Sequence, residues 1–210
     1  MYAKIKIMKR NDLKLGNVPI INSNLKLGNS LVNIQKIEFI KSKIIELNNI
    51  KYAVAEVGVY KGGSAKVILE VMNRECILYL FDTFEGIPNK TEYDNITIIG
   101  DFNDILYDDI LKFFKIYDNV KIYKGVFPQD TSKYVECEKF KFVHLDVDTY
   151  ISYKESLEFF YNKMIIGGYI LFDDYNEPTC IGATKAINEF FENKKEKVRQ
   201  NNKSYYIMKE

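Results

Sequence analysis

Residues 52–65 read YAVAEVGVYKGGSA, and this stretch decides the fold class. It begins with a short β-rich run, YAVAEV, and passes through a glycine-rich turn, GVYKGG. It then enters SAKVILEVM, where apolar residues recur at helical spacing. A strand that leads through such a turn into a helix is one step of the alternation that builds a parallel sheet.

The rest of the chain repeats this alternation outward from residue 65. Further strands are predicted at CILYLF (76–81), NVKIYKGVF (119–127), KFKFVHLD (139–146) and GGYILFDD (167–174), and helices at 105–117, 153–164 and 182–194. The closing runs KVRQ and SYYIM, separated by NNK, predict a β-hairpin. Nearly continuous apolar strands between helices are typical of an α/β fold, with a parallel sheet covered on both faces.

The first 50 residues differ from the rest of the chain in composition and periodicity. Residues 1–29 are rich in Asn, Lys and Gly without a clear period, which predicts an irregular arm. Ser30 is the predicted cap of an amphipathic helix over 31–47, whose apolar residues recur at intervals of three and four. We expect residues 1–50 to form an N-terminal arm and helix, serving as a cap or an oligomer contact, before one main domain over 51–210.

Composition excludes several classes of partner. The 210 residues carry 30 basic and 29 acidic side chains, and a net charge of +1 gives no electrostatic footprint for nucleic acid or an anionic membrane. No run approaches the ~18 apolar residues of a membrane span, and the N-terminus lacks the apolar core of a signal peptide. The scattered Cys76, Cys137 and Cys180 argue against a disulfide framework or structural zinc. We expect a cytoplasmic protein that can form a homodimer or a higher homo-oligomer.

The glycine-rich stretch EVGVYKGGSA (56–65) is the first candidate binding element. Gly58 lets the backbone approach a ligand, Gly62 and Gly63 permit a tight turn, and the helix start offers free N–H groups. The spacing is neither the dinucleotide G-x-G-x-x-G nor a P-loop. Asp82 ends the next strand, 24 residues after Gly58 (82 − 58), near the distance of about 20 at which an acidic group binds ribose hydroxyls. The alternatives are a turn that binds no ligand, for the glycine-rich stretch, and a helix cap or loop carboxylate, for Asp82.

Two later strands end in paired carboxylates. FVHLDVDTY (142–150) carries Asp146 and Asp148, and GGYILFDDY (167–175) carries Asp173 and Asp174. Two residues apart in extended chain, Asp146 and Asp148 share a face. Ligands of parallel sheets bind at the carboxyl ends of the strands, where these four groups would repel one another unless a cation neutralises them. Hard oxygen ligands suit Mg²⁺, Mn²⁺ or Ca²⁺. Helix capping or solvent exposure is the alternative.

His144 is the single histidine of the chain and lies two residues before Asp146. This spacing places it on the same face as Asp146 in a strand. A core histidine satisfied by a hydrogen bond and a catalytic histidine both fit the position. A histidine-based metal site is not available without a second His.

Six motifs occur in order between about residues 52 and 192: EVGVYKGGSA, LFDTFEGIP, KGVFP, HLDVDTYIS, GGYILFDDY and GATKAINEF. Together they resemble the TylF/MycF (macrocin-type) O-methyltransferases. The resemblance implies a Rossmann-like class I methyltransferase fold, with a seven-stranded, mostly parallel sheet, helices on both faces and a C-terminal antiparallel hairpin. It implies a methyltransferase domain over 51–210 that uses S-adenosylmethionine, assisted by Mg²⁺ or Mn²⁺, to methylate a hydroxyl of a sugar or glycoside.

The resemblance also assigns roles to matching positions. The loop that would hold the methionine part of the cofactor comprises Glu56, Gly58, Val59, Tyr60, Lys61, Gly62, Gly63 and Ser64. Asp82 would bind the ribose, with Thr83 and Phe84 lining the same pocket, and Gly125, Val126 and Phe127 would lie near the adenine. The metal ligands would be Asp146, Asp173 and Asp174, an arrangement similar to catechol O-methyltransferase. Asp146 is the first candidate for the base, beside Asp148 and His144.

Two other functions compete with this interpretation. A nucleotide-binding enzyme of Rossmann type would carry a G-x-G-x-x-G loop and a catalytic pair such as Tyr-x-x-x-Lys, and the loop spacing disfavours it. A non-catalytic protein that keeps the fold would have lost its acidic ligands, yet all four aspartates are present.

Overall fold

The computed structural model describes residues 26–210, and the predicted arm up to residue 25 lies outside the described residues. Seven strands form one sheet in the order β3-β2-β1-β4-β5-β7-β6. The strands are β1 Ala53–Val57, β2 Leu78–Asp82, β3 Val120–Lys124, β4 Phe140–Leu145, β5 Met164–Phe172, β6 Arg199–Asn201 and β7 Ser204–Met208. The helices are α1 Ile34–Glu46, α2 Gly63–Val71, α3 Tyr107–Phe114, α4 Tyr150–Phe160 and α5 Ile181–Phe191, with 3₁₀ turns η1 Ser132–Val135 and η2 Tyr161–Lys163.

The sheet is parallel except where the closing hairpin joins it. β1 pairs in parallel with β2 and β4, β2 pairs with β3, and β4 pairs with β5. β7 runs antiparallel to β5, and β6 runs antiparallel to β7. The predicted seven-stranded, mostly parallel sheet with a C-terminal antiparallel hairpin is confirmed.

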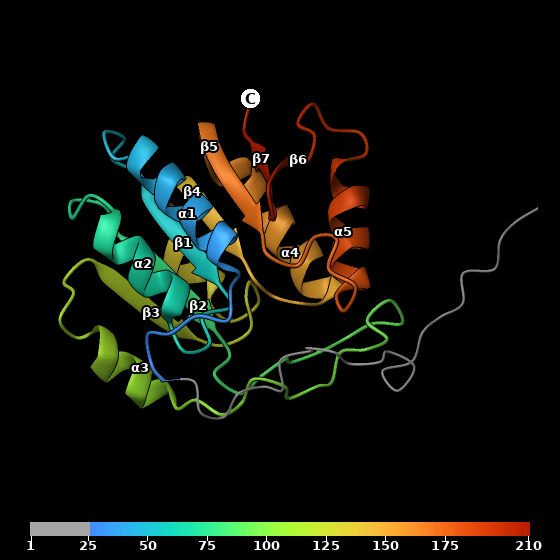
Figure 1. Cartoon of the computed structure of the whole chain (residues 1–210), viewed down its shortest axis with the longest axis horizontal. Helices are drawn as coiled ribbons and strands as arrows, with labels where there is room; N and C mark the ends of the chain where they lie inside the picture. The colour runs from blue at the N-terminus through green and yellow to red at the C-terminus, as the bar shows by residue number, and fades with distance from the viewer. Residues whose placement is uncertain (1–25) are drawn as a thin grey trace, which may run out of the picture.

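Helices cover both faces of the sheet (Figure 1). α1, α2 and α3 lie on one face, and α4 and α5 lie on the other. Side chains of β1 alternate between the two cores: Val54 packs with the first group of helices, and Ala55 and Val57 pack with the second. The central strands are apolar nearly throughout because both of their faces are buried.

The N-terminal helix begins later than predicted and belongs to the main core. α1 starts at Ile34 because the side chain of Asn33 accepts a hydrogen bond from Gln35 N–H at 2.9 Å. The prediction that Ser30 caps this helix is wrong, since its hydroxyl accepts from Val32 N–H before the helix begins. Apolar residues of α1, among them Ile40, pack in one core with α2 and β1, so residue 50 does not separate two cores.

Contacts from distant segments move two other predicted boundaries. The helix predicted over 153–164 is α4, which begins at Tyr150, where Asp94 from the long loop after β2 accepts the Tyr150 N–H at 2.9 Å. A remote carboxylate thus satisfies a free donor at the helix start. The strand predicted over 167–174 is β5, which begins at Met164, opposite Phe140 of β4.

Across residues 26–210, no helix is both long enough and apolar enough to cross a membrane.

A buried ion pair fixes the closing hairpin to the sheet. Glu196, before β6, is 2% exposed and accepts hydrogen bonds from Lys209 Nζ and from Tyr161 Oη at 2.6 Å. Burial alone would raise the pKa of Glu196, but the bonds from Lys209 and Tyr161 outweigh it and lower the pKa to about 2 from an ordinary 4.5. The ionised carboxylate therefore contributes to stability.

We expect Glu196→Gln to lower the free energy of unfolding at pH 7 by about 1–2 kcal/mol, measured by urea denaturation. Because the pKa of Glu196 is lower in the folded chain, its contribution is complete above pH 4.5 and is lost as the pH falls towards 2. The difference between the wild type and the variant should shrink at pH 3. Glu192→Gln, at an exposed position, is the control and should change little at either pH. An equal loss at both pH values would contradict the ion-pair account.

Candidate active site

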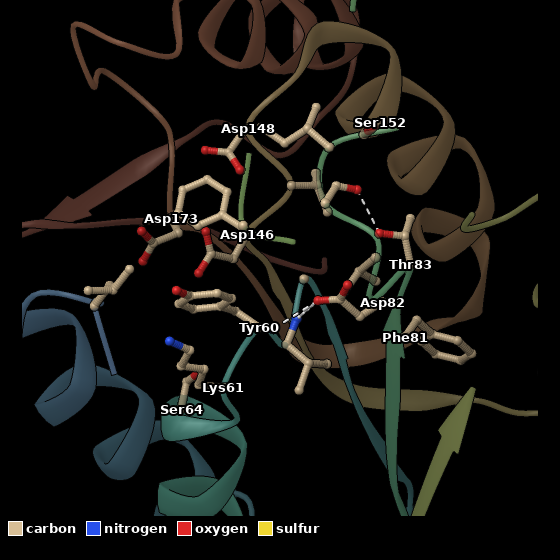
Figure 2. Close-up of a pocket in the computed structure, with 18 of the residues that line it drawn as sticks. Tyr60, Lys61, Ser64, Phe81, Asp82, Thr83, Asp146, Asp148, Ser152 and Asp173 are labelled. Atoms are coloured by element: carbon tan, nitrogen blue, oxygen red, sulfur yellow. Dashed lines mark hydrogen bonds between the residues drawn. The ribbon is translucent and has the colours of Figure 1, made fainter. Parts of the chain in front are cut away.

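A pocket lies at the carboxyl ends of the parallel strands, around the point where the strand order reverses between β1 and β4. Its walls come from residues 57–61, 63 and 64 after β1, 81–83 at the end of β2, 86–88 and 102 in the following loop, 125–127 after β3, 146–148 and 152 after β4, and 173–174 after β5. Residues 29–32, before α1, complete it. Figure 2 shows Asp146, Asp148 and Asp173 gathered on one side and Asp82 and Thr83 on the other.

Gly58 brings the loop after β1 against the end of β4. Its φ is +85°, and a Cβ there would lie 1.7 Å from the carbonyl oxygen of Asp146. Its need for glycine thus comes from the neighbouring backbone, whereas the sequence suggested only a ligand. Gly62 has φ +76° and packs beside Phe114, outside the pocket lining. It precedes α2, whose first residues, Gly63 and Ser64, line the pocket.

Asp82 organises the glycine loop through its carboxylate. Oδ2 accepts the N–H groups of Val59 at 2.7 Å and Tyr60 at 2.8 Å, and Oδ1 accepts the N–H of Phe84 at 2.7 Å. A carboxylate offers about four acceptor positions, so capacity remains for a ligand hydroxyl. Asp82 lines the pocket, and its role towards ribose stays a prediction.

Most of the predicted cofactor residues line the pocket together. They are Gly58, Val59, Tyr60, Lys61, Gly63, Ser64, Asp82, Thr83, Gly125, Val126 and Phe127. The prediction that Phe84 lines it is wrong, because a turn with φ +52° sends this ring into the core beside Tyr107. Glu56 also lies outside the lining, fully buried within β1.

The four aspartates separate into two groups. In one, Asp146 and Asp173 offer ligand atoms within 4.8 Å of each other and of His144. In the other, Asp148 and Asp174 lie similarly close to Cys180. The strand ends at Leu145 and Asp148 has φ +59°, so the chain is not extended there, and the premise that placed Asp146 and Asp148 on one face does not hold.

Asp174 is held by its surroundings more firmly than the other three. Its Oδ2 accepts the N–H groups of Val147 at 3.1 Å and Asp148 at 3.0 Å, and the hydroxyl of Tyr153 at 2.8 Å. These bonds join the turn after β4 to the turn after β5. Asp174 thereby fixes the relative position of the two acidic strand ends.

The four clustered carboxylates, of which Asp174 is buried and the others partly so, shift one another's pKa values strongly. Burial, and then the charges of Asp173 and Asp174, raise the pKa of Asp146 well above its ordinary value. Burial and the charge of Asp174 raise the pKa of Asp148, and burial with Asp173 raises that of Asp174 to about 6. Burial would raise the pKa of Asp173, but the neighbouring His144 and Lys36 outweigh it and lower the pKa.

The donor set fits a hard divalent cation. Asp173 Oδ1 is buried and has no hydrogen-bond partner within residues 26–210. Asp146, beside it, makes no side-chain hydrogen bond or ion pair with the described part of the chain. Oxygen donors of this kind, crowded and short of compensating positive charge, suit Mg²⁺ or Mn²⁺. The ligand assignment to Asp146, Asp173 and Asp174 stays a prediction.

His144 lies beneath the acidic group rather than in the pocket. It is fully buried on β4, with Nδ1 2.8 Å from Glu56 Oε1 and Nε2 3.6 Å from Asp173 Oδ1. Burial would lower the pKa of His144, but the neighbouring carboxylates of Asp173 and Glu56 raise it to about 10. Of the two roles that the sequence left open, this placement favours the hydrogen-bonded core histidine.

Sequence reasoning missed several residues of the site. Asn29–Val32 form a wall of the pocket, and Lys36 of α1 pairs with Asp173. Asp104 accepts from Tyr60 Oη and Lys61 Nζ, each at 2.7 Å, and so holds the glycine loop from the far side. None of these residues belongs to a motif, and only the folded chain brings them to the site.

The strand order, the antiparallel β7, and the glycine loop and acidic residue after the first two strands define a Rossmann-like class I methyltransferase. Within that class, the chain belongs to the TylF (macrocin-O-methyltransferase) family, which matches residues 26–202. It is therefore an S-adenosylmethionine-dependent O-methyltransferase, as the motifs predicted.

Three known proteins illustrate the relationship. Demethyldecarbamoylnovobiocin O-methyltransferase of Streptomyces niveus is 25% identical over 178 residues, covering 77% of this chain and 67% of the relative. Mycinamicin III 3''-O-methyltransferase of Micromonospora griseorubida is 26% identical over 155 residues, covering 65% of this chain and 59% of the relative. The solved structure of the O-methyltransferase NovP has a TM-score of 0.75 at 21% identity, over 86% of this chain and 82% of that one. The chain thus spans 59–67% of the curated relatives' length.

We expect Gly58→Ala to lose at least about 3 kcal/mol of stability, or to fail to fold, because a Cβ collides with the Asp146 carbonyl at a positive φ. Gly167→Ala is the matched control, since its φ is +79° but nothing lies within 4 Å of an added Cβ. It should lose only about 1 kcal/mol, from backbone strain alone. Urea denaturation of both variants measures the difference, and equal losses would show that the approach to Asp146 is not the constraint.

Proposed function

We propose that this protein transfers the methyl group of S-adenosylmethionine to a hydroxyl of a sugar or glycoside, assisted by Mg²⁺ or Mn²⁺. The observation that carries the proposal is the group of carboxylates that line the pocket, among them Asp173, whose buried Oδ1 makes no hydrogen bond with the described residues. The relatives' names support the acceptor class: they describe O-methylation of mycinamicin III at a 3'' oxygen and of demethyldecarbamoylnovobiocin. Family membership disfavours the nucleotide-binding alternative.

The glycine loop would position the cofactor. The first residues of α2, Gly63 and Ser64, border the pocket, and the free N–H groups of a helix start favour an anion such as the methionine carboxylate. Asp82 holds the loop amides and keeps acceptor capacity for ribose hydroxyls. The chemistry that the cofactor supplies is an electrophilic methyl group on a sulfonium, and the protein aligns it with the acceptor oxygen.

The pocket carboxylates Asp146, Asp148, Asp173 and Asp174, here called the acidic wall, would bind the cation and activate the acceptor hydroxyl. Asp146, Asp173 and Asp174 would hold the cation, which when bound lowers the pKa of a hydroxyl ligand and fixes its orientation. Asp146 and Asp148 both border the pocket, and burial raises the pKa of each, which makes each carboxylate a stronger base. We keep Asp146 as the first candidate for accepting the hydroxyl proton, with Asp148 beside it.

The wider setting of the enzyme stays a set of predictions. We expect a cytoplasmic location, no nucleic-acid or membrane partner, and a role for residues 1–50 as a cap or a homo-oligomer contact. α1 supports the last expectation in part, because the segment that leads into it borders the pocket.

Calorimetry with S-adenosylhomocysteine tests the cofactor part of the proposal. We expect binding in the micromolar range, and no heat at millimolar ligand would overturn it. Incubation of sugars and glycosides with labelled S-adenosylmethionine then tests the acceptor class. Turnover should require Mg²⁺ or Mn²⁺, and full activity in excess EDTA would remove the cation from the proposal.

We expect Asp173→Asn to lower cation-dependent turnover at least about 100-fold, because it neutralises a predicted ligand. Binding of S-adenosylhomocysteine should stay within about threefold, since the glycine loop and Asp82 are intact. Asp108→Asn, at an exposed carboxylate of α3 outside the pocket, is the control and should behave as the wild type. Full activity of Asp173→Asn in Mg²⁺ would refute the ligand assignment.

A further inference from the structure

Lys36 is a buried lysine that reaches the acidic wall from α1. Only 4% of it is exposed, although lysine is rarely buried without a partner. Its ammonium donates to the backbone carbonyl of Asp173 at 2.6 Å, to Asp173 Oδ2 at 3.2 Å and to Glu177 Oε1 at 3.2 Å. These bonds use all three donors of the ammonium, and each is strengthened by charge.

The contact with Lys36 gives the two carboxylate oxygens of Asp173 different surroundings. Oδ2 is occupied by Lys36, while Oδ1 is buried, makes no hydrogen bond with the described residues, and lies 3.6 Å from His144 Nε2. Asp173 also belongs to the group with Asp146. The bond from Lys36 to the Asp173 carbonyl also fixes the main chain where β5 ends. Rotation of the carboxylate would break the pairing with Lys36, so this pairing holds Oδ1 in place.

The support for this lysine is rigid. Neighbouring residues of α1, Ile37 and Ile40, are buried in the core shared with α2. The segment before the helix lies over the glycine loop, where the N–H of Gly28 donates to the carbonyl of Lys61 at 2.8 Å. A side chain on such an element holds its partner in one geometry, as a site for a small ion requires.

We propose that Lys36 is a positioning residue of the cation site: it occupies one oxygen of Asp173 and thereby presents the other to the ion. The inference rests on the proposed function, which places a divalent cation at these carboxylates. It assigns α1 a part in forming the active site, where the sequence suggested a cap or an oligomer contact.

The sign of the effect separates positioning from simple electrostatics. A fixed positive charge beside a cation repels it, so removal of that charge would by itself tighten cation binding. If Lys36 positions the ligand, its removal weakens binding, and partners that orient metal ligands typically contribute about 10–100-fold in affinity. If Lys36 only links α1 to β5, its removal lowers the stability of the fold but leaves the cation affinity of the folded protein unchanged.

Binding of Mn²⁺ to the full chain, followed by electron paramagnetic resonance without cofactor or acceptor, tests the proposal. We expect Lys36→Met and Lys36→Gln to weaken Mn²⁺ binding at least about tenfold. The dissociation constant for S-adenosylhomocysteine should stay within about threefold. Lys36→Gln keeps a polar group at the buried position, so the test holds if the methionine variant does not fold.

Lys43→Met is the matched control. Lys43 lies on the same helix and pairs with Glu46, away from the pocket, so this variant should bind Mn²⁺ within twofold of the wild type. Unchanged or tighter Mn²⁺ binding by the folded Lys36 variants would overturn the positioning role and leave the proposed function in place. If the wild type bound no Mn²⁺, the cation part of the proposed function would fail, and this inference with it.

Discussion

Repulsion among the clustered, partly buried carboxylates at the ends of β4 and β5 is the constraint around which the site is arranged. Hydrogen bonds and opposite charges offset part of this repulsion. Lys36 and His144 hold Asp173, while backbone amides and a tyrosine hydroxyl hold Asp174. Asp146 makes no side-chain hydrogen bond or ion pair within the described part of the chain, and burial with the charges of Asp173 and Asp174 raises its pKa in spite of the nearby His144. Burial of unpaired charge is costly, so the remaining imbalance is the physical argument for a cation.

The cofactor side of the pocket is tied to the acidic side by backbone packing. Gly58 lies so close to the Asp146 carbonyl that no side chain fits between them. Asp82 then orders the loop that Gly58 begins, and Asp104 holds the same loop from outside. A methyl donor on the loop and an acceptor at the carboxylates would therefore meet in one fixed arrangement, which is what an in-line displacement requires.

Much of the fold could be predicted because it depends on patterns that are local in the sequence. Strands buried on both faces are apolar throughout, and helices with one buried face repeat every three to four residues. The misplaced boundaries involve partners that the sequence pattern does not reveal: Asn33 rather than Ser30 caps α1, and Asp94 completes the start of α4 from 56 residues away. Site residues that lie within a sequence motif could be predicted, whereas Lys36 and Asp104, which lie in no motif, could not.

The sequence alone was enough to predict the class of the protein, because the order of strands, glycine loop and acidic strand ends is a linear pattern along the chain. It also determined which residue types meet at the carboxyl edge of the sheet. The contacts that each of those residues makes at the site are set by the folded chain. The left-handed turn at Asp148 separates it from Asp146, Asp174 turns an oxygen towards backbone amides, and Lys36 reaches Asp173 across 137 residues of sequence. Such contacts depend on packing between distant elements, for which a local pattern carries no signal.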